Sequence, residues 1–143
     1  MARITLDEKS WPVVVIRFPA GYSDADFASY LSELGAVLKR EPRALVLDTR
    51  GAQTPAATQR QQLMHFVKAH WPALHRLRGL AFIVESSVAR HALTAISWAV
   101  AKPCPIQMVS SMGEALDWAQ ARSTRGHVLV RTEQHARIYE DPR

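Results

Sequence analysis

Polar groups of the kinds that bind anions or transfer protons stand directly after three apolar segments of the sequence, residues 44–47, 80–84 and 106–109. A carboxylate beside a guanidinium can bind an anion or take part in acid–base chemistry, and hydroxyl groups near helix N-termini favour bound anions. The groups concerned are Asp48, Thr49 and Arg50, then Glu85, Ser86 and Ser87, then Ser110 and Ser111, with Thr54 a little beyond the first set.

The same residues also have a purely structural interpretation. Thr54, Ser87 and Ser111 are good helix caps, and Asp48 and Arg50 can order a loop between a strand and a helix. Paired carboxylates such as Asp48 and Glu85 can do acid–base work, but at the ends of strands they are more often simply solvated. The residue types alone therefore leave a ligand or phosphate site and a set of caps as alternatives.

Other signatures of chemistry are missing from the sequence. It holds no G-x-S-x-G turn, no glycine-rich phosphate loop and no zinc-type spacing of Cys and His. His65, His70 and His75 recur every fifth residue, so on a helix each is rotated by roughly 140° from the last and they cannot share one face as metal ligands. We expect no catalytic residue, no metal and no cofactor.

The elements that must position the polar groups follow from the apolar pattern. β-Branched and apolar runs predict strands, and apolar residues at i, i+3, i+4 and i+7 predict helices. The first two strands are expected to form an antiparallel hairpin across residues 7–10. Strands are predicted over residues 4–6, 11–18, 44–47, 80–84 and 106–109, and helices over 23–40, 54–74, 88–101 and from Ser111 onward.

Strands that alternate with helices predict right-handed βαβ units on a parallel sheet. The fold class is therefore α/β: a single domain with a four- to six-stranded sheet, mostly parallel but mixed at its N-terminal edge, and about four helices. The carboxyl ends of parallel strands share one edge of a sheet, where ligands of open α/β folds bind, so the polar groups should gather there. From Ser123 the chain turns polar, and residues 123–143 are predicted to be a tail with one short strand over 127–131.

The helix predicted over residues 88–101 carries a candidate interface. One face is apolar and rich in small residues, whereas His91, Thr94 and Trp98 lie well round the helix from it. A tryptophan away from the core face is typical of an interface, although it can also pack beneath a neighbouring helix or the tail. A homodimer through this surface is one hypothesis.

Charge and cysteine content restrict the classes of binding partner and the cellular compartment. The net charge of +5 is spread along the chain without a basic block, so nucleic-acid binding would rest on charge alone. Cys104 is the one cysteine, which excludes an internal disulfide and suits a reducing cytosol. The first residues have no signal-peptide pattern and no segment is long enough to span a membrane, so we expect a cytoplasmic protein.

The order of segments LVLDTRG, LAFIVESS, PIQMVSS and GEALDWAQAR resembles STAS/SpoIIAA-like domains, whose distant relatives include CRAL-TRIO-like lipid-binding folds. The resemblance covers residues 4–122, with residues 45–51 the most telling, and residues 94–98 and 114–118 look like stretches found in an uncharacterised bacterial branch. In anti-sigma-factor antagonists a serine at the start of the second helix, within an Asp-Ser pair, is phosphorylated. This chain has no such pair there, and Thr54 and Thr58 are the nearest hydroxyls, which argues against a phosphorylation switch.

The resemblance implies a non-enzymatic module that binds a protein or a small ligand. The leading hypothesis is a regulatory or protein-interaction domain, with a homodimer as one form of it. The first alternative is a module that holds a lipid or small anion at the strand ends or between helices. An enzyme, for which the sequence offers only Asp48, Arg50 and Glu85, ranks below both.

Overall fold

The computed structural model describes residues 3–85 and 102–132, with only the backbone course for residues 125–132. The helix predicted over 88–101 lies outside the described residues, and with it Ser86, Ser87, His91, Thr94 and Trp98. The elements are β1 (Thr5–Asp7), β2 (Val13–Arg17), α1 (Asp24–Leu38), β3 (Ala44–Asp48), α2 (Ala57–Ala69), α3 (Trp71–His75), β4 (Gly79–Ile83), β5 (Ile106–Val109) and α5 (Met112–Thr132).

The strands form one five-stranded sheet in the order β1-β2-β3-β4-β5. β1 and β2 pair antiparallel, with Leu6 opposite Ile16, and every later pair is parallel. The α/β class and the mixed sheet predicted from the sequence are confirmed. The parallel register puts Arg17, Asp48 and Ile83 side by side at the carboxyl ends of β2, β3 and β4.

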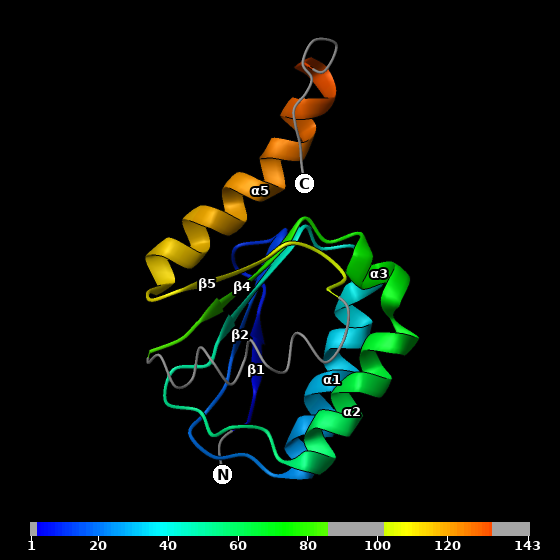
Figure 1. The fold of residues 1–143 in the computed structure, drawn as a ribbon, viewed down its shortest axis with the longest axis vertical. Helices are drawn as coiled ribbons and strands as arrows, with labels where there is room; N and C mark the ends of the chain where they lie inside the picture. Colours follow the sequence, from blue (N-terminus) through cyan, green and yellow to red (C-terminus); the bar gives the residue numbers. More distant parts are fainter. Residues whose placement is uncertain (1–2, 86–101, 133–143) are drawn as a thin grey trace.

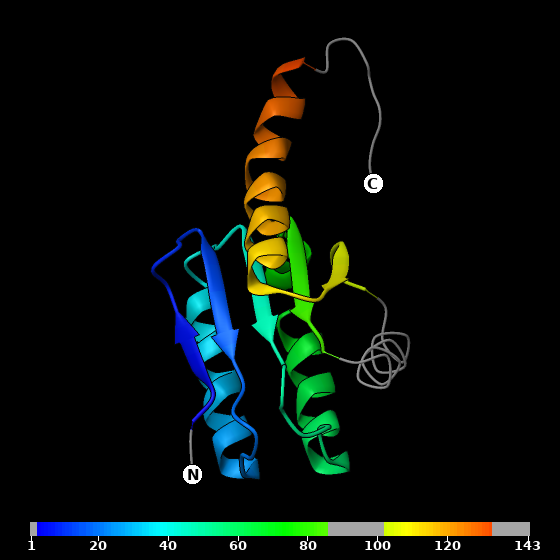
Figure 2. The ribbon, with the colours of Figure 1, turned by 90° about the vertical axis from the view of Figure 1, so that its left-hand side faces the viewer.

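Helices cover both faces of the sheet (Figures 1 and 2). On one face α1 and α2 pack over alternate residues of the central strands, among them Val14, Ile16 and Leu45. On the other face α5 lies over the intervening residues, including Val15, Val46 and Ala81. Successive residues of a strand point to opposite faces, so β2 and β3, which are apolar on both faces, must lie between two layers of helices.

Small side chains let α5 approach the sheet closely. Ala115 and Ala119 of the helix are fully buried, and so are Ala44 and Ala81 of the strands beneath them. At Gly79 an added Cβ atom would lie only 2.6 Å from Cη2 of Trp118. The position of α5 therefore depends on the absence of a side chain at Gly79.

The helix α5 is longer than the sequence suggested. It runs to Thr132 and extends past the end of the sheet (Figures 1 and 2). The short strand predicted over residues 127–131 is therefore wrong. The prediction rested on the β-branched residues of that stretch, and strand propensity is easily overridden when a helix already started at Ser111 continues.

Two further predictions about helix ends are wrong. The second helix is not capped by Thr54 but begins after Ala56, whose N–H donates to Oε1 of Gln59 at 3.1 Å. The same helix does not continue to Leu74, because it ends near His70 and α3 begins with Pro72 in its first turn. Pro72 has no N–H to donate to the carbonyl four residues earlier, and its ring would clash with that carbonyl, so α2 cannot continue through this position.

Candidate functional site

The carboxyl ends of the parallel strands bring the predicted polar groups to one edge of the sheet. We call the described part of this edge the rim, meaning residues 48–54, 85, 110 and 111. The loop after β3 is tied to the next strand, because both the backbone N–H and the hydroxyl of Thr49 donate to the carbonyl of Ile83, at 3.2 and 2.8 Å. The rim is therefore anchored directly to the sheet.

An ion pair orders the start of the rim. The guanidinium of Arg50 binds Asp48 in a fork, with Nε 2.9 Å from Oδ1 and Nη2 2.8 Å from Oδ2. The backbone N–H of Arg50 also donates to Oδ1 of Asp48. These contacts hold the pKa of Asp48 below its usual value, with the Arg50 hydrogen bond as the largest cause, and they raise the pKa of Arg50.

The second predicted carboxylate lies beside the same loop. Glu85 accepts a hydrogen bond from the backbone N–H of Gly51, and its charge contributes to the raised pKa of Arg50. Gly51 has φ of +74°, a conformation that favours glycine because it has no Cβ atom. Asp48 and Glu85 are thus both near Arg50, and the loop is shaped so that a backbone donor reaches Glu85.

Of the two serines after β5, Ser111 caps α5 with its side chain, and Ser110 contributes its backbone N–H. Oγ of Ser111 accepts from the N–H of Glu114 at 3.2 Å, and Oε1 of Glu114 accepts from the N–H of Ser110 at 3.1 Å. Ser111 therefore caps the start of α5, as the sequence predicted, and Glu114 three residues later completes an arrangement like a capping box. Thr54 is exposed, and Thr58, the other hydroxyl near this helix start, donates to Oδ2 of Asp24 at 3.2 Å.

The described rim is poorly suited to acid–base catalysis. A general acid at neutral pH needs a raised carboxyl pKa, whereas the pKa of Asp48 is lowered. The side chain of Asp48 is committed to Arg50, and Glu85 is committed to a backbone N–H. The arrangement instead presents an exposed, internally hydrogen-bonded loop with the Arg50 side chain 40% accessible.

Nucleophilic and metal chemistry gain no support from the other candidate residues. Cys104 is buried, and burial raises the pKa of its thiol to about 12, so it is not a thiolate at neutral pH. His70 stacks on Phe66, and Nδ1 of His75 lies 2.9 Å from the carbonyl of Pro103. Within residues 3–85 and 102–132, no three His, Cys, Asp or Glu side chains are grouped so as to hold a metal ion.

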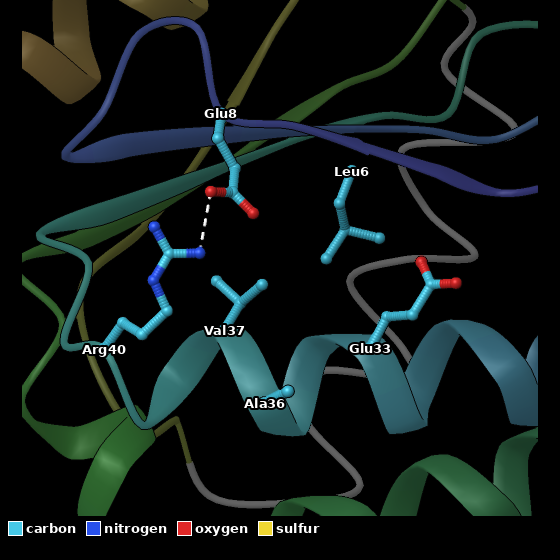
Figure 3. A pocket seen from close by; sticks show the side chains of 6 residues that line it. All are labelled: Leu6, Glu8, Glu33, Ala36, Val37 and Arg40. Carbon is cyan, nitrogen blue, oxygen red and sulfur yellow. Dashed lines mark hydrogen bonds and ion pairs between the residues drawn. The ribbon is translucent and has the colours of Figure 1, made fainter.

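Sequence reasoning missed a shallow groove between β1 and α1, with a volume of about 300 Å³ (Figure 3). Apolar Leu6 of β1 and Val37 of α1 line it from opposite sides, and Glu8 and Arg40 pair at one end with 2.7 Å between Oε1 and Nη1. Its helical residues, Glu33, Ala36, Val37 and Arg40, are spaced i, i+3, i+4 and i+7 and therefore lie on one face of α1. The lining residues are Leu6, Glu8, Glu33, Ala36, Val37 and Arg40.

Membrane insertion has no candidate element in the part of the chain that the structure describes. None of its helices combines the length and the apolar character that a bilayer span requires.

Comparison with known proteins identifies the fold. The sequence matches no known family profile, and no curated protein matches it. Among solved structures, an anti-sigma factor antagonist from Mycobacterium paratuberculosis aligns over 82% of this chain and 92% of its own, with a TM-score of 0.54 and 17% identity. An uncharacterized protein of the DUF3478 family with a SpoIIAA-like fold, from Shewanella loihica, aligns over 81% of this chain and 91% of its own, with a TM-score of 0.58 and 12% identity.

These alignments span nearly the whole of each neighbour, and at such identities they establish the fold alone. The resemblance read from residues 4–122 is thereby confirmed at the level of the fold. The chain has the STAS/SpoIIAA-like fold.

Proposed function

We propose that the chain is a non-enzymatic regulatory domain that acts by binding another protein, with the rim as its contact surface. The observation that carries the proposal is the self-contained hydrogen bonding of the rim. Asp48 is held by Arg50, Glu85 by the N–H of Gly51, and Ser111 by Glu114. A surface whose charges are already paired and held in place can dock a partner without first being ordered.

The shape of this surface favours a protein over a small molecule. The rim loop is joined to the loop before α1, because Nε2 of Gln53 donates to the carbonyl of Tyr22 and the hydroxyl of Tyr22 donates to the carbonyl of Gln53, both at 3.4 Å. Gln53 and Thr54 themselves are exposed. An exposed, braced pair of loops at the end of a rigid sheet is the kind of scaffold on which binding residues are commonly placed.

The fold neighbour adds a second line of support. Its name says that it antagonises an anti-sigma factor, which is a protein. We extend to this chain only the general mode of action, binding to a protein partner, and not the identity of that partner. A cytoplasmic location, and self-association through His91, Thr94 and Trp98, stay hypotheses from the sequence.

Site-specific photo-crosslinking in cells tests the proposal. A benzoylphenylalanine side chain at Gln53 or Thr54 should yield a discrete protein adduct, identified by mass spectrometry. The same residue at Ser32, exposed on α1 away from the rim, is the matched control and should not yield that adduct. Equal yields of the same adduct from both surfaces, or no adduct from the rim, would contradict the proposal that the rim is the protein contact surface.

A further inference from the structure

Arginine side chains gather at the end of the sheet opposite the rim. Arg43 directly precedes β3, Arg78 directly precedes β4, and Arg122 lies on the part of α5 that crosses this end. Backbone contacts tie the three positions together. The N–H of Arg78 donates to the carbonyl of Arg43 at 2.8 Å, and Nε of Arg122 donates to the carbonyl of Arg78 at 3.1 Å.

Unlike four other arginines, these three have no acidic partner among the described residues. Arg3, Arg17, Arg40 and Arg50 each pair with a carboxylate. Within the described residues, Arg43 and Arg122 donate only to carbonyls, Arg43 through Nη1 to Ser123 at 3.1 Å. The guanidinium of Arg122 also lies 5.5 Å from the ring centre of Trp118, a cation–π contact that limits its movement.

One donor of the cluster is left without a partner. Nη1 of Arg78 is buried and makes no hydrogen bond to any described residue. All three arginines are half-buried, and burial followed by the nearby charge of Arg43 lowers the pKa of Arg78. A buried, unpaired donor on a charged group costs free energy, and so do like charges close together in a poorly solvated place.

An oxyanion bound beside the cluster would relieve the repulsion between the like charges and offer acceptor oxygens to its guanidinium groups. The planar guanidinium offers donors in a fork that fits the oxygens of a phosphate, and it stays charged at all physiological pH values. We propose that Arg43, Arg78 and Arg122 form a binding site for a phosphate-class oxyanion, such as the phosphoryl group of a small molecule. The site lies at the opposite end of the sheet from the rim and is independent of the proposed protein contact.

Isothermal titration calorimetry with inorganic phosphate and with pyrophosphate, at constant ionic strength, tests this site. We expect saturable binding at one site per chain. Arg43→Gln and Arg122→Gln should each weaken it at least tenfold. Arg60→Gln is the matched control, because Arg60 is exposed, has no acidic partner among the described residues and also donates to a carbonyl, that of Pro55. Tighter binding of pyrophosphate would assign a diphosphate ligand, and equal or tighter binding of phosphate a single phosphoryl group.

A second readout separates binding from structural damage. The rise in unfolding temperature caused by pyrophosphate, measured within each variant, should vanish in Arg122→Gln and persist in Arg60→Gln, whatever the baseline stability of each. Arg122→Lys keeps the charge without the fork and should bind with intermediate affinity. The proposal is overturned if neither anion binds saturably, or if Arg60→Gln loses as much affinity as the cluster variants.

Discussion

The packing of α5 on the sheet predicts a large effect from one added methyl group. A Cβ atom at Gly79 would lie 2.6 Å from Cη2 and 2.7 Å from Cζ3 of Trp118. These distances are well below van der Waals contact, so Gly79→Ala must displace the indole or the helix. Overpacking of this kind costs about 1–3 kcal/mol. Reduced freedom of the unfolded chain returns roughly 0.4–1 kcal/mol, which leaves a net loss on the order of 1–2 kcal/mol.

A double-mutant cycle isolates this contact. Phenylalanine lacks the outer ring atoms that meet the new methyl group, so Gly79→Ala should be nearly neutral in a Trp118→Phe background. The coupling energy between the two changes should then be about 1–2 kcal/mol, within the range known for residues in contact. The free energies come from urea unfolding followed by circular dichroism, since tryptophan fluorescence changes with the second substitution.

Gly113→Ala provides the control for glycine removal itself. Gly113 lies in the first turn of α5, and an added Cβ would come no closer than 4.0 Å to Oγ of Ser111. This change should be neutral or stabilise the protein by up to about 1 kcal/mol. If Gly79→Ala lowers the free energy of unfolding equally with tryptophan and with phenylalanine at position 118, the indole does not pack against Gly79 and the packing argument is refuted.

Three further predictions concern a cap, a charge and a thiol. Ser23→Ala should lower stability by about 1 kcal/mol in urea unfolding, because Oγ of Ser23 caps α1 by accepting from the N–H of Asp26 at 3.0 Å; unchanged stability would contradict the capping box. The pKa of Asp48 is lower in the folded protein than its ordinary 3.8, so its ionised form contributes stability that is fully present above that value and is lost as pH falls through the lower folded pKa. The stability difference between wild type and Asp48→Asn should therefore shrink on acidification below pH 3.8, and a pH-independent difference would exclude the Arg50 pair as its source. Cys104 should react with a thiol reagent at neutral pH only at the rate of unfolding, because burial raises its pKa to about 12; rapid labelling of the folded protein would show that the thiol is accessible.

The central architecture was predictable because its signals are local and mutually consistent. The runs at residues 13–16, 44–47 and 80–83 are continuous and apolar, as expected of strands covered on both faces, and the Ser111 cap followed from its residue type. Parallel strands end at the same edge of a sheet, so the position of Asp48 and Glu85 at one edge could be predicted without knowledge of tertiary contacts.

The errors occurred where tertiary contacts decide the outcome. Thr54 looks like a cap, but Gln59 is fully buried and bridges from the N–H of Ala56 to Oδ1 of Asp24, which moves the start of α2 beyond Thr54. The length of α5 was hidden because its last turns lack the amphipathic pattern of a helix packed on a core.

The arginine cluster could not be predicted from the sequence for a different reason. Arg43, Arg78 and Arg122 are scattered along the sequence, and each reads as an ordinary surface cation on its own. They meet only because β3 and β4 start at the same end of the sheet and α5 crosses that end. A site assembled from three elements leaves no local signal in one sequence.

The central claim is that the rim binds a protein, and the most direct measurement is the affinity of the partner recovered by crosslinking for two surface variants. Thr54→Arg places a bulky charge on the rim, whereas Ser32→Arg places the same side chain on the exposed face of α1. Calorimetry should show at least a tenfold loss of affinity for Thr54→Arg and none for Ser32→Arg, with both variants folded by circular dichroism. Unchanged affinity for Thr54→Arg would contradict the account.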